Sequence, residues 1–266
     1  MKRFFSFLLI GLMVISISGC TEVITYDDLY QDYQTHLNQN EAIYQSHIDY
    51  FNHISTETIK SVVSVKKTVF ASSGSMTGSG VIFYEDSLYY YVLTNNHVVY
   101  EESSYSVNYS VGDYNGNNYS ATLVANSSAF DLGIVRFRKG SELLDVIEFA
   151  EENPALNLNI AILGYPSFQI NAITLGTSID YTVIDIENPS TDVVNVDFPV
   201  LVATAPVKSG SSGSAVINDS YALIGVVYAG NFSNNSDVSQ YAFIIPVEKV
   251  FAFFEHVEFD FGGDSE

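Results

Sequence analysis

The chain has 266 residues, of which 47% are apolar and 14% aromatic, so it can bury a sizeable core as one two-lobed domain or two small ones. Only 15% of the residues are charged, yet 31 acidic side chains against 10 basic ones give a formal net charge of −21. Like-charge repulsion therefore argues against binding to nucleic acid or to anionic lipid headgroups.

The first 20 residues have the pattern of a signal peptide. Lys2 and Arg3 precede an apolar run at 4–17, which is shorter than the ~20 residues that span a bilayer. Residues 17–20 (ISGC) resemble the lipobox of bacterial lipoproteins, in which cleavage before the cysteine leaves its thiol carrying diacylglycerol. The alternative is an ordinary secretory signal in which Cys20 is incidental.

The lipobox resemblance implies a protein anchored in the cell membrane through lipidated Cys20, on the extracytoplasmic face. Two or more acyl chains, such as palmitate, at ~0.8 kcal/mol per buried CH₂ would hold it there stably. Cys20 is the only cysteine, so its lipidation leaves no disulfide. The fold must then be held by packing alone, although the compartment would be oxidising or external.

Residues 21–57 are predicted to form a helical spacer. Apolar side chains recur in it at spacings of three, four and seven residues, and Thr25 with Asp28 resembles a capping box at its start. We interpret the segment as a helix that lies against the following domain or lifts it off the membrane, and a separate binding function is the alternative. The recurring side chains are those of Tyr30, Tyr33, Leu37, Tyr44, Ile48 and Phe51.

Beyond residue 57 the period of the apolar residues changes to two, as in short strands separated by Gly, Asn and Ser. The first series predicts a barrel at about 58–150, and Asn115-Gly116 within it is a strong hairpin signal. The second series, after a break near 151–154, predicts a barrel at about 155–245. The predicted strands are 61–65, 80–84, 89–94, 105–111, 119–124 and 132–137 in the first series and 160–164, 172–177, 180–186, 201–205, 215–217, 223–227 and 241–245 in the second.

The predicted fold class is therefore all-β, with two six-stranded antiparallel β-barrels, an N-terminal helical segment and a short C-terminal helix. That closing helix is predicted at 246–256, beginning at Pro246, because a proline's missing N–H costs nothing in a first helical turn. The folded domain would span 58–258, and the tail at 259–266 is expected to be loose.

Three segments supply the parts of a serine-based acyl-transfer site: a nucleophile, a base and a carboxylate that orients the base. His97 ends an apolar strand, Asp131 leads into a buried strand, and Ser212 lies in a turn of small residues. Each of these residues alone would more often be structural. Their joint occurrence, with His and Asp in the first barrel and Ser in the second, predicts a catalytic triad.

The sequence around these residues resembles the trypsin-like serine peptidases, most closely the bacterial HtrA-type and glutamyl-endopeptidase-type members. Residues 94–99 (TNNHVV), 131–135 (DLGIV) and 210–215 (GSSGSA) are similar to the family's histidine, aspartate and serine motifs. Lesser landmarks of the family are matched at 77–82, 163–166, 173–176, 223–226 and 243–247, so the resemblance covers about 59–256.

The resemblance implies a serine endopeptidase that hydrolyses protein or peptide substrates through an acyl-enzyme intermediate and needs no cofactor or metal. Ser212 would attack the scissile carbonyl, His97 would accept and return the proton, and Asp131 would orient the imidazole. The amides of Gly210 and Ser212 would form the oxyanion hole, where loss of one donor costs roughly 10²–10³ in rate. Since an ordinary histidine has a pKa of about 6.5, activity is expected to rise between pH ~6 and ~8.

The same resemblance allows an interpretation of the substrate pocket. Pro206 stands six residues before the nucleophile, where relatives selective for basic side chains carry an acid. Val227 stands where glutamyl endopeptidases carry a histidine. With Tyr228 and Ala229, these residues predict an apolar pocket and hence cleavage after small or medium apolar residues.

Other classes of protein fit the sequence less well. The nucleophile elbow of α/β-hydrolases ends in glycine where this chain has Ser214, and the Ser, Asp, His order of that class is reversed here. A zinc enzyme needs clustered ligands, whereas the five histidines are scattered. A solute-binding lipoprotein would be larger and built from alternating strands and long helices.

The most serious alternative is a catalytically silent pseudopeptidase of the same fold, which would bind peptides or proteins at the surface. The intact triad favours the enzyme. Only about ten residues follow the predicted closing helix, so we do not expect the PDZ domain that commonly follows the HtrA-type peptidase domain. The sequence leaves open the oligomeric state, the physiological substrate and any need for activation.

Overall fold

The computed structural model describes residues 26–70, 74–102, 106–141, 143–166, 172–186, 195–232 and 236–262. Cys20 and Thr25 lie outside these ranges, so the lipobox and the capping box stay predictions. The chain divides into two compact units, Met1–His47 and Ile48–Glu266. Among the helices in the described ranges, none has both the length and the apolar character needed to traverse a membrane.

A long helix, α1 (Tyr26–Thr56), occupies the described part of the segment predicted to be helical. Its last turns belong to the second unit, where Ile54 is fully buried and the Tyr50 hydroxyl donates a hydrogen bond to the carbonyl of Asn218 at 3.1 Å. The short 3₁₀ helix η1 (Thr58–Ser61) then leads into the first strand.

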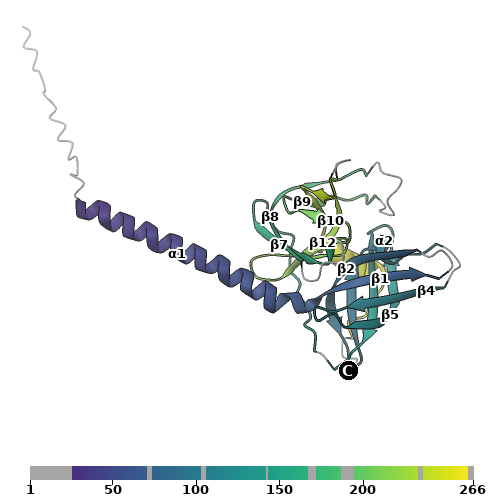
Figure 1. The fold of residues 1–266 in the computed structure, drawn as a ribbon. Coiled ribbons are helices and arrows are strands. Elements are labelled where there is room, and N and C mark those ends of the chain that lie inside the picture. Colours follow the sequence, from purple (N-terminus) through teal and green to yellow (C-terminus); the bar gives the residue numbers. More distant parts are fainter. Residues whose placement is uncertain are drawn as a thin grey trace, which may run out of the picture. The chain divides into compact units, whose positions relative to one another are not determined.

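The first barrel is a closed antiparallel sheet of six strands in the order β1-β2-β3-β6-β5-β4. Figure 1 labels β1, β2, β4 and β5 of this barrel. Its interior is filled by apolar side chains such as Val65, Ile82 and Phe137. The predicted hairpin turn lies between β4 and β5 at Gly116, whose φ of 84° is accessible to glycine without strain. The strands are β1 (Val62–Val69), β2 (Ser75–Glu85), β3 (Tyr89–Thr94), β4 (Val107–Gly112), β5 (Asn118–Ser127) and β6 (Leu132–Arg138).

The second barrel is also a closed antiparallel sheet of six strands, in the order β11-β12-β14-β9-β8-β7. Ile160, Leu201 and Ile244 are among the side chains that fill it. The prediction of two six-stranded barrels is thus confirmed. The strands are β7 (Asn159–Gly164), β8 (Ala172–Thr182), β9 (Val200–Ala203), β11 (Ala215–Ile217), β12 (Leu223–Gly230) and β14 (Ala242–Pro246), and a separate two-stranded sheet joins β10 (Val207–Lys208) to β13 (Val238–Ser239).

The two strands predicted at 172–177 and 180–186 were wrong as separate elements. The chain forms one strand, β8, which ends at Thr182. The chain stays extended between the two predicted strands. Its register opposite β9 shifts between Ser178 and Asp180, and the strand continues through this irregularity. The Ser178 hydroxyl accepts a hydrogen bond from the Leu158 amide at 3.0 Å, which satisfies a polar group that is fully buried.

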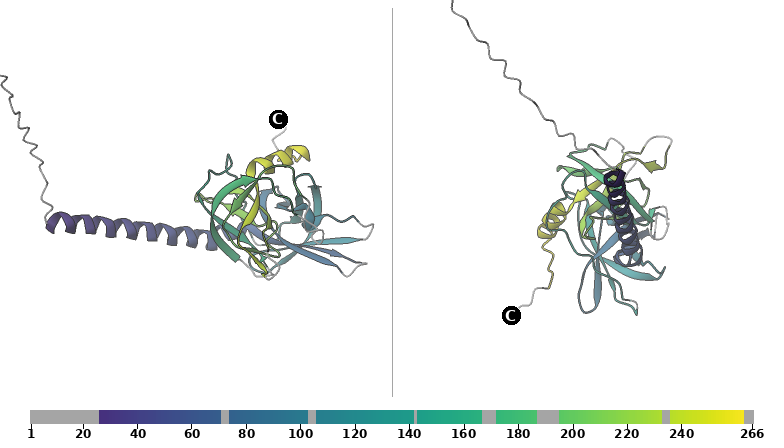
Figure 2. Two further views of the ribbon diagram at one scale, coloured as in Figure 1. Left: turned by 90° about the horizontal axis from the view of Figure 1, so that it is seen from above. Right: turned by 90° about the vertical axis from the view of Figure 1, so that its left-hand side faces the viewer.

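A third apolar cluster lies between the barrels and is covered by the closing helix α3 (Val247–His256). Pro246 is its N-cap, close to the predicted start. Figure 2 shows α3, in yellow, on the outside of the barrels. Its Phe254 stacks on Phe83 of the first barrel with ring centroids 4.8 Å apart, while Phe253 is fully buried in the same cluster. The helix therefore fixes the two barrels to each other, which positions the groups that each contributes to the site.

Candidate active site

His97 and Asp131 are brought together by neighbouring strands of the first barrel. β3 and β6 pair antiparallel with Thr94 opposite Gly133, so residues just after β3 lie beside residues just before β6. His97 lies in the short helix α2 (Asn96–Val99), which follows β3. His97 Nδ1 and Asp131 Oδ2 are 2.6 Å apart, and the His97 amide donates to Asp131 Oδ1 at 2.9 Å.

Further hydrogen bonds hold the backbone of Asp131. Its carbonyl accepts from the Asn96 amide and from Asn95 Nδ2, both at 3.0 Å. Asn96 Oδ1 in turn accepts from Asn126 Nδ2 at 2.7 Å. The φ of Asp131 is 46°, in the left-handed region that is uncommon for residues other than glycine. These bonds therefore keep Asp131 in an uncommon conformation that directs its carboxylate at His97.

Burial sets the electrostatics of this pair. Asp131 is fully buried and His97 is only 7% exposed. Removal from water raises the pKa of the Asp131 carboxyl above its usual range, and the hydrogen bonds and charge of His97 oppose that rise. Burial also raises the pKa of the nearby Tyr228 phenol, and the charge of Asp131 adds to the effect. In surroundings this dry, a carboxylate interacts more strongly with an imidazolium than it does in water.

Ser212 lies in the turn between β10 and β11 of the second barrel, and this turn is tied to the first barrel. The Ser79 amide donates to the Ser212 carbonyl at 2.7 Å, and Ser79 Oγ donates to the Gly210 carbonyl at 2.8 Å. Gly213, with a φ of 86°, lies so close that a Cβ on it would be 2.0 Å from the Ser79 carbonyl oxygen. Only glycine fits this position, because both the backbone conformation and the space require it.

The amides proposed for the oxyanion hole are available for a ligand. Within the described residues, the N–H groups of Gly210 and Ser212 donate no hydrogen bond, whereas the amides of Ser211, Gly213 and Ser214 are all bonded to carbonyls. Gly210 has a φ of 90°, so its amide reaches an orientation that other residues rarely adopt. Two neighbouring donors beside the Ser212 hydroxyl can bind a carbonyl oxygen.

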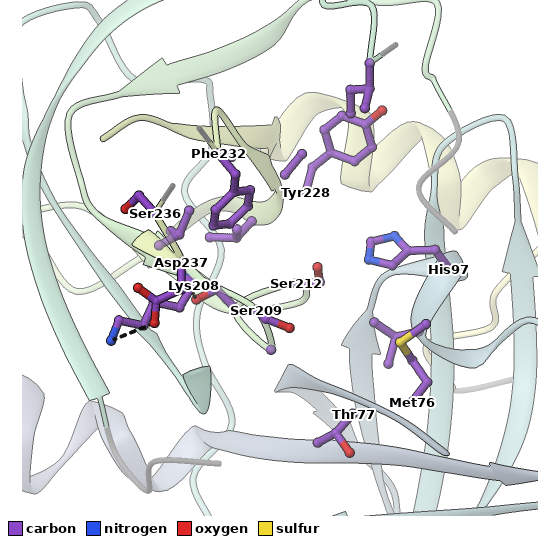
Figure 3. A pocket seen from close by; sticks show the side chains of 18 residues that line it. Met76, Thr77, His97, Lys208, Ser209, Ser212, Tyr228, Phe232, Ser236 and Asp237 are labelled. Carbon is purple, nitrogen blue, oxygen red and sulfur yellow. Dashed lines mark hydrogen bonds and ion pairs between the residues drawn. The ribbon is translucent and has the colours of Figure 1, made fainter. Parts of the chain in front are cut away.

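Ser212 and His97 line one cavity of about 490 Å³. Figure 3 shows the His97 ring directed into this cavity on the side where the Ser212 hydroxyl lies. Across the described part of the chain, Ser212 and His97 make no hydrogen bond with each other. The cavity has a largely apolar wall, formed by Met76, Val207, Val227, Tyr228, Ala229 and Phe232.

The two other ionisable side chains that line the cavity, Lys208 and Asp237, are paired with each other. Lys208 Nζ and Asp237 Oδ2 are 3.9 Å apart, and the Lys208 side chain is partly exposed while that of Asp237 is almost fully exposed. Neither therefore supplies a buried, unpaired charge that would attract an ionic substrate side chain. The described residues include no cluster of three or more His, Cys, Asp or Glu placed to hold a metal ion.

Of the four residues predicted to form the pocket, three line this cavity: Val227, Tyr228 and Ala229. Pro206 instead lines a separate, smaller cavity of about 220 Å³ with Ile162 and Thr174. The next residue, Val207, pairs with Ser239 in the two-stranded sheet and lines both cavities, so the chain runs between the two cavities at this point. The prediction placed Pro206 in the pocket by its distance in sequence from Ser212, which takes no account of this two-stranded sheet.

Several residues that shape the site were not predicted. Ser79 lies inside a matched landmark, but its bonds to the serine turn could not be read from one sequence. Met76 stands two residues before Gly78 on β2, and strand alternation places both on the face toward the site. Phe232 follows β12 in a segment without periodicity, so no pattern indicated that it lines the cavity.

The chain is similar to known peptidases in sequence and in fold. A protein-family model described as "Trypsin-like peptidase domain" matches residues 78–226. "Serine protease Do-like HtrB" of Bacillus subtilis is 30% identical over 149 residues, which cover 56% of this chain and 31% of that protein. The chain spans about a third of the length of the curated relatives that it matches.

Solved structures share the fold. The active form of the Rv3671c protease from M. tuberculosis superposes with a TM-score of 0.61 at 21% identity, covering 75% of this chain and 82% of that one. A variant of the HtrA-type protease AlgW, solved with a tripeptide, gives a TM-score of 0.62 at 21% identity, covering 78% and 63%. At this identity the likeness concerns the double-barrel architecture.

Proposed function

Because the chain belongs to the trypsin-like peptidase family, we propose that it is a serine endopeptidase in which Ser212, His97 and Asp131 form the catalytic triad. The observation that carries the proposal is the 2.6 Å contact between His97 Nδ1 and the fully buried Asp131 Oδ2, at a cavity that Ser212 also lines. A buried carboxylate that fixes one imidazole nitrogen leaves the other nitrogen to exchange a proton in the cavity.

In the proposed reaction, Ser212 Oγ forms a bond to the carbonyl carbon of the scissile peptide while its proton moves to His97 Nε2. Collapse of the tetrahedral intermediate breaks the C–N bond, and His97 returns the proton to the leaving amine. Water then hydrolyses the acyl-enzyme by the same steps, with His97 again acting as base. Asp131 keeps the proton of the imidazole on Nδ1 and stabilises the imidazolium.

Ser212 and His97 line the same cavity, and no hydrogen bond joins them in the described structure. Catalytic hydrogen bonds are often long in the free enzyme and become shorter only when substrate binds. The unbonded amides of Gly210 and Ser212 would donate hydrogen bonds to the developing oxyanion, and removal of one such donor costs roughly 10²–10³ in rate. These features support the enzyme over the pseudopeptidase alternative.

The substrate side chain before the scissile bond is proposed to be apolar and of small or medium size. Val227, Ala229 and Phe232 present hydrocarbon to the cavity, and its charged side chains, Lys208 and Asp237, are paired at its exposed edge. An ionic substrate side chain would lose its hydration without gaining a buried partner, which is unfavourable.

We further propose that the mature chain is a lipoprotein, held at the extracytoplasmic face of the membrane through Cys20. The proposal rests on the signal-like segment and its ISGC sequence. Metabolic labelling with an alkyne analogue of palmitate should mark the wild-type chain and not Cys20→Ser. Labelling of the Cys20→Ser chain would place the acyl group elsewhere, and an unlabelled wild-type chain would favour an ordinary secretory signal.

The test of the catalytic proposal is labelling of the full chain with a fluorophosphonate probe, with casein hydrolysis measured in parallel. Ser212→Ala and His97→Ala should abolish both signals, whereas Ser220→Ala, on an exposed turn, should retain them as a matched control. Absence of labelling in a folded wild-type chain would favour the pseudopeptidase. Labelling that persists in Ser212→Ala would assign the nucleophile to another residue.

A further inference from the structure

The helix α1 carries an apolar stripe whose spacing is that of a coiled coil. Tyr30, Leu37, Tyr44 and Phe51 follow one another at intervals of seven, and Tyr33 stands three residues after the first of them. In a heptad written abcdefg these are a positions and one d position. The exposed seam consists of Tyr30, Leu37, Tyr44 and Phe51 at a, and Tyr33, Asn40 and His47 at d. Ile54, at the next d position, is fully buried in the second unit and is not part of the seam.

The stripe is exposed along most of the helix. Between Tyr30 and Asp49, every residue except Gln34 is exposed to solvent, and the exposed fraction reaches 57% for Tyr33 and 71% for Tyr44. Helices in proteins owe most of their stability to packing of an apolar face. A repeat of seven maintained over three heptads keeps that face in line with a second helix, because an unsupercoiled helix would drift away from it by ~20° per heptad.

We propose that α1 binds α1 of a second copy of this chain, as a parallel, in-register, two-stranded coiled coil. In such a dimer each g residue meets the e residue of the partner's following heptad. Ile43 at g then meets the partner's Ile48, so the exposed isoleucines outside the seam cover each other. His36 at g meets the partner's Glu41, which pairs a base with an acid.

The charges of α1 fit a second copy better than a membrane surface. The helix contains no Lys or Arg, and none of its acidic residues stands in the seam. Amphipathic helices that lie on membranes commonly carry Lys and Arg on the polar face. Asp32 and Asp49, at c and f, point to the solvent side of a coiled coil, where charge is tolerated. The acidic residues of α1 are Asp27, Asp28, Asp32, Glu41 and Asp49.

The area of the stripe is sufficient for such a pair. Seven apolar side chains of α1 from Tyr30 to Phe51 are at least 43% exposed. A buried aromatic side chain covers roughly 150–250 Å², so burying the exposed parts of the seven would remove several hundred Å² of surface from each copy. This area is on the order of the ~800 Å² per partner that a standard stable interface buries.

The register can be tested by disulfide cross-linking of the full chain in a Cys20→Ala background, where an introduced thiol is the only one. Leu37→Cys places two thiols face to face at an a position, where helix backbones approach within the ~4.4–6.8 Å that a disulfide spans. Ala42→Cys, at f on the outer side, is the matched control. Under mild oxidation, we expect a covalent dimer for Leu37→Cys and none for Ala42→Cys.

Native mass spectrometry of the detergent-solubilised full chain counts the copies. We expect a dimer for the wild type, a monomer for Leu37→Glu/Tyr44→Glu, and a dimer for Gln31→Glu/Asn38→Glu, which adds the same charge with the same spacing on the outer face. Both double variants should label with the fluorophosphonate probe to the same extent per molecule as the wild type. A monomeric wild type would overturn the proposal, as would equal cross-linking at 37 and 42, and a dimer that does not cross-link at 37 would overturn the parallel register.

Discussion

Ser79 of the first barrel and Gly210 of the second are joined by a 2.8 Å hydrogen bond from the Ser79 hydroxyl to the Gly210 carbonyl. The same hydroxyl accepts from the Tyr165 amide at 2.9 Å, and the Ser79 amide donates to the Ser212 carbonyl at 2.7 Å. Ser79 is fully buried. Through this one residue, the barrel that carries His97 positions the turn that carries Ser212.

Ser79→Ala is expected to lower kcat by about tenfold or more, which corresponds to ~1.4 kcal/mol, with a smaller change in KM. Loss of the hydroxyl leaves the Tyr165 amide and the Gly210 carbonyl without their partner, and an unsatisfied buried group costs about 1–3 kcal/mol. The serine turn would shift to recover these bonds. Steady-state kinetics on a peptide ester with an apolar residue before the scissile bond measures both constants.

Ser64→Ala is the matched control for that experiment. Ser64 is on β1 of the same barrel, and its hydroxyl donates only a long bond of 3.4 Å to the Gly112 carbonyl. The kcat of Ser64→Ala should equal that of the wild type. Equal losses in the two variants would show that Ser79 acts on the stability of the barrel and not on the serine turn.

Gly213→Ala is expected to destabilise the fold by several kcal/mol more than Gly116→Ala. The two glycines have nearly the same φ, 86° and 84°, so alanine meets the same backbone strain of about 1–3 kcal/mol at both. They differ in space, because a Cβ at 213 would be 2.0 Å from the Ser79 carbonyl oxygen, whereas nothing lies within 4 Å at 116. Urea denaturation of both variants measures the difference, and similar midpoints would contradict the close packing of the serine turn.

Asp131→Asn is expected to lower kcat by roughly 10⁴, because asparagine favours the wrong imidazole tautomer while it preserves the shape of the carboxylate. Probe labelling by the fluorophosphonate should slow by a similar factor, since it depends on the same base. A variant with nearly normal kcat would remove Asp131 from the triad, whatever its distance to His97.

The same variant gives a pH dependence of stability. Because burial raises the pKa of Asp131 in the folded chain, this group's contribution to stability is complete below the ordinary carboxyl pKa and is lost as the pH rises through the higher folded-state pKa. Asparagine does not titrate. The melting temperature of Asp131→Asn relative to the wild type should therefore increase from acidic to neutral pH. A difference that falls as the pH rises would mean that pairing with His97, and not burial, dominates.

The sequence predicted those parts of the molecule that depend on short-range patterns. Alternation located most strands to within a few residues, and the motifs around His97, Asp131 and Ser212 indicated segments that the fold brings to one place. The prediction divided β8 into two strands, whereas the chain stays extended through a register shift between Ser178 and Asp180 that depends on its pairing with β9. The bonds of Ser79 and the position of Phe232 depend on pairs of residues far apart in the chain, and periodicity carries no information about these.

The composition of the cavity wall predicts how selectivity can be changed. Ala229→Phe fills part of the space beside Val227 and Phe232, so it should lower kcat/KM for substrates with Leu or Met before the scissile bond more than for those with Ala. One methylene of misfit is worth about 1–3 kcal/mol, or 10–200-fold. Pro206 lines the neighbouring cavity and not the main one, so Pro206→Ala should leave the ranking of these substrates unchanged. A peptide series varied at that one position measures both effects, and a ranking altered by Pro206→Ala, or a wild-type preference for Lys, Arg or Glu, would contradict the apolar pocket.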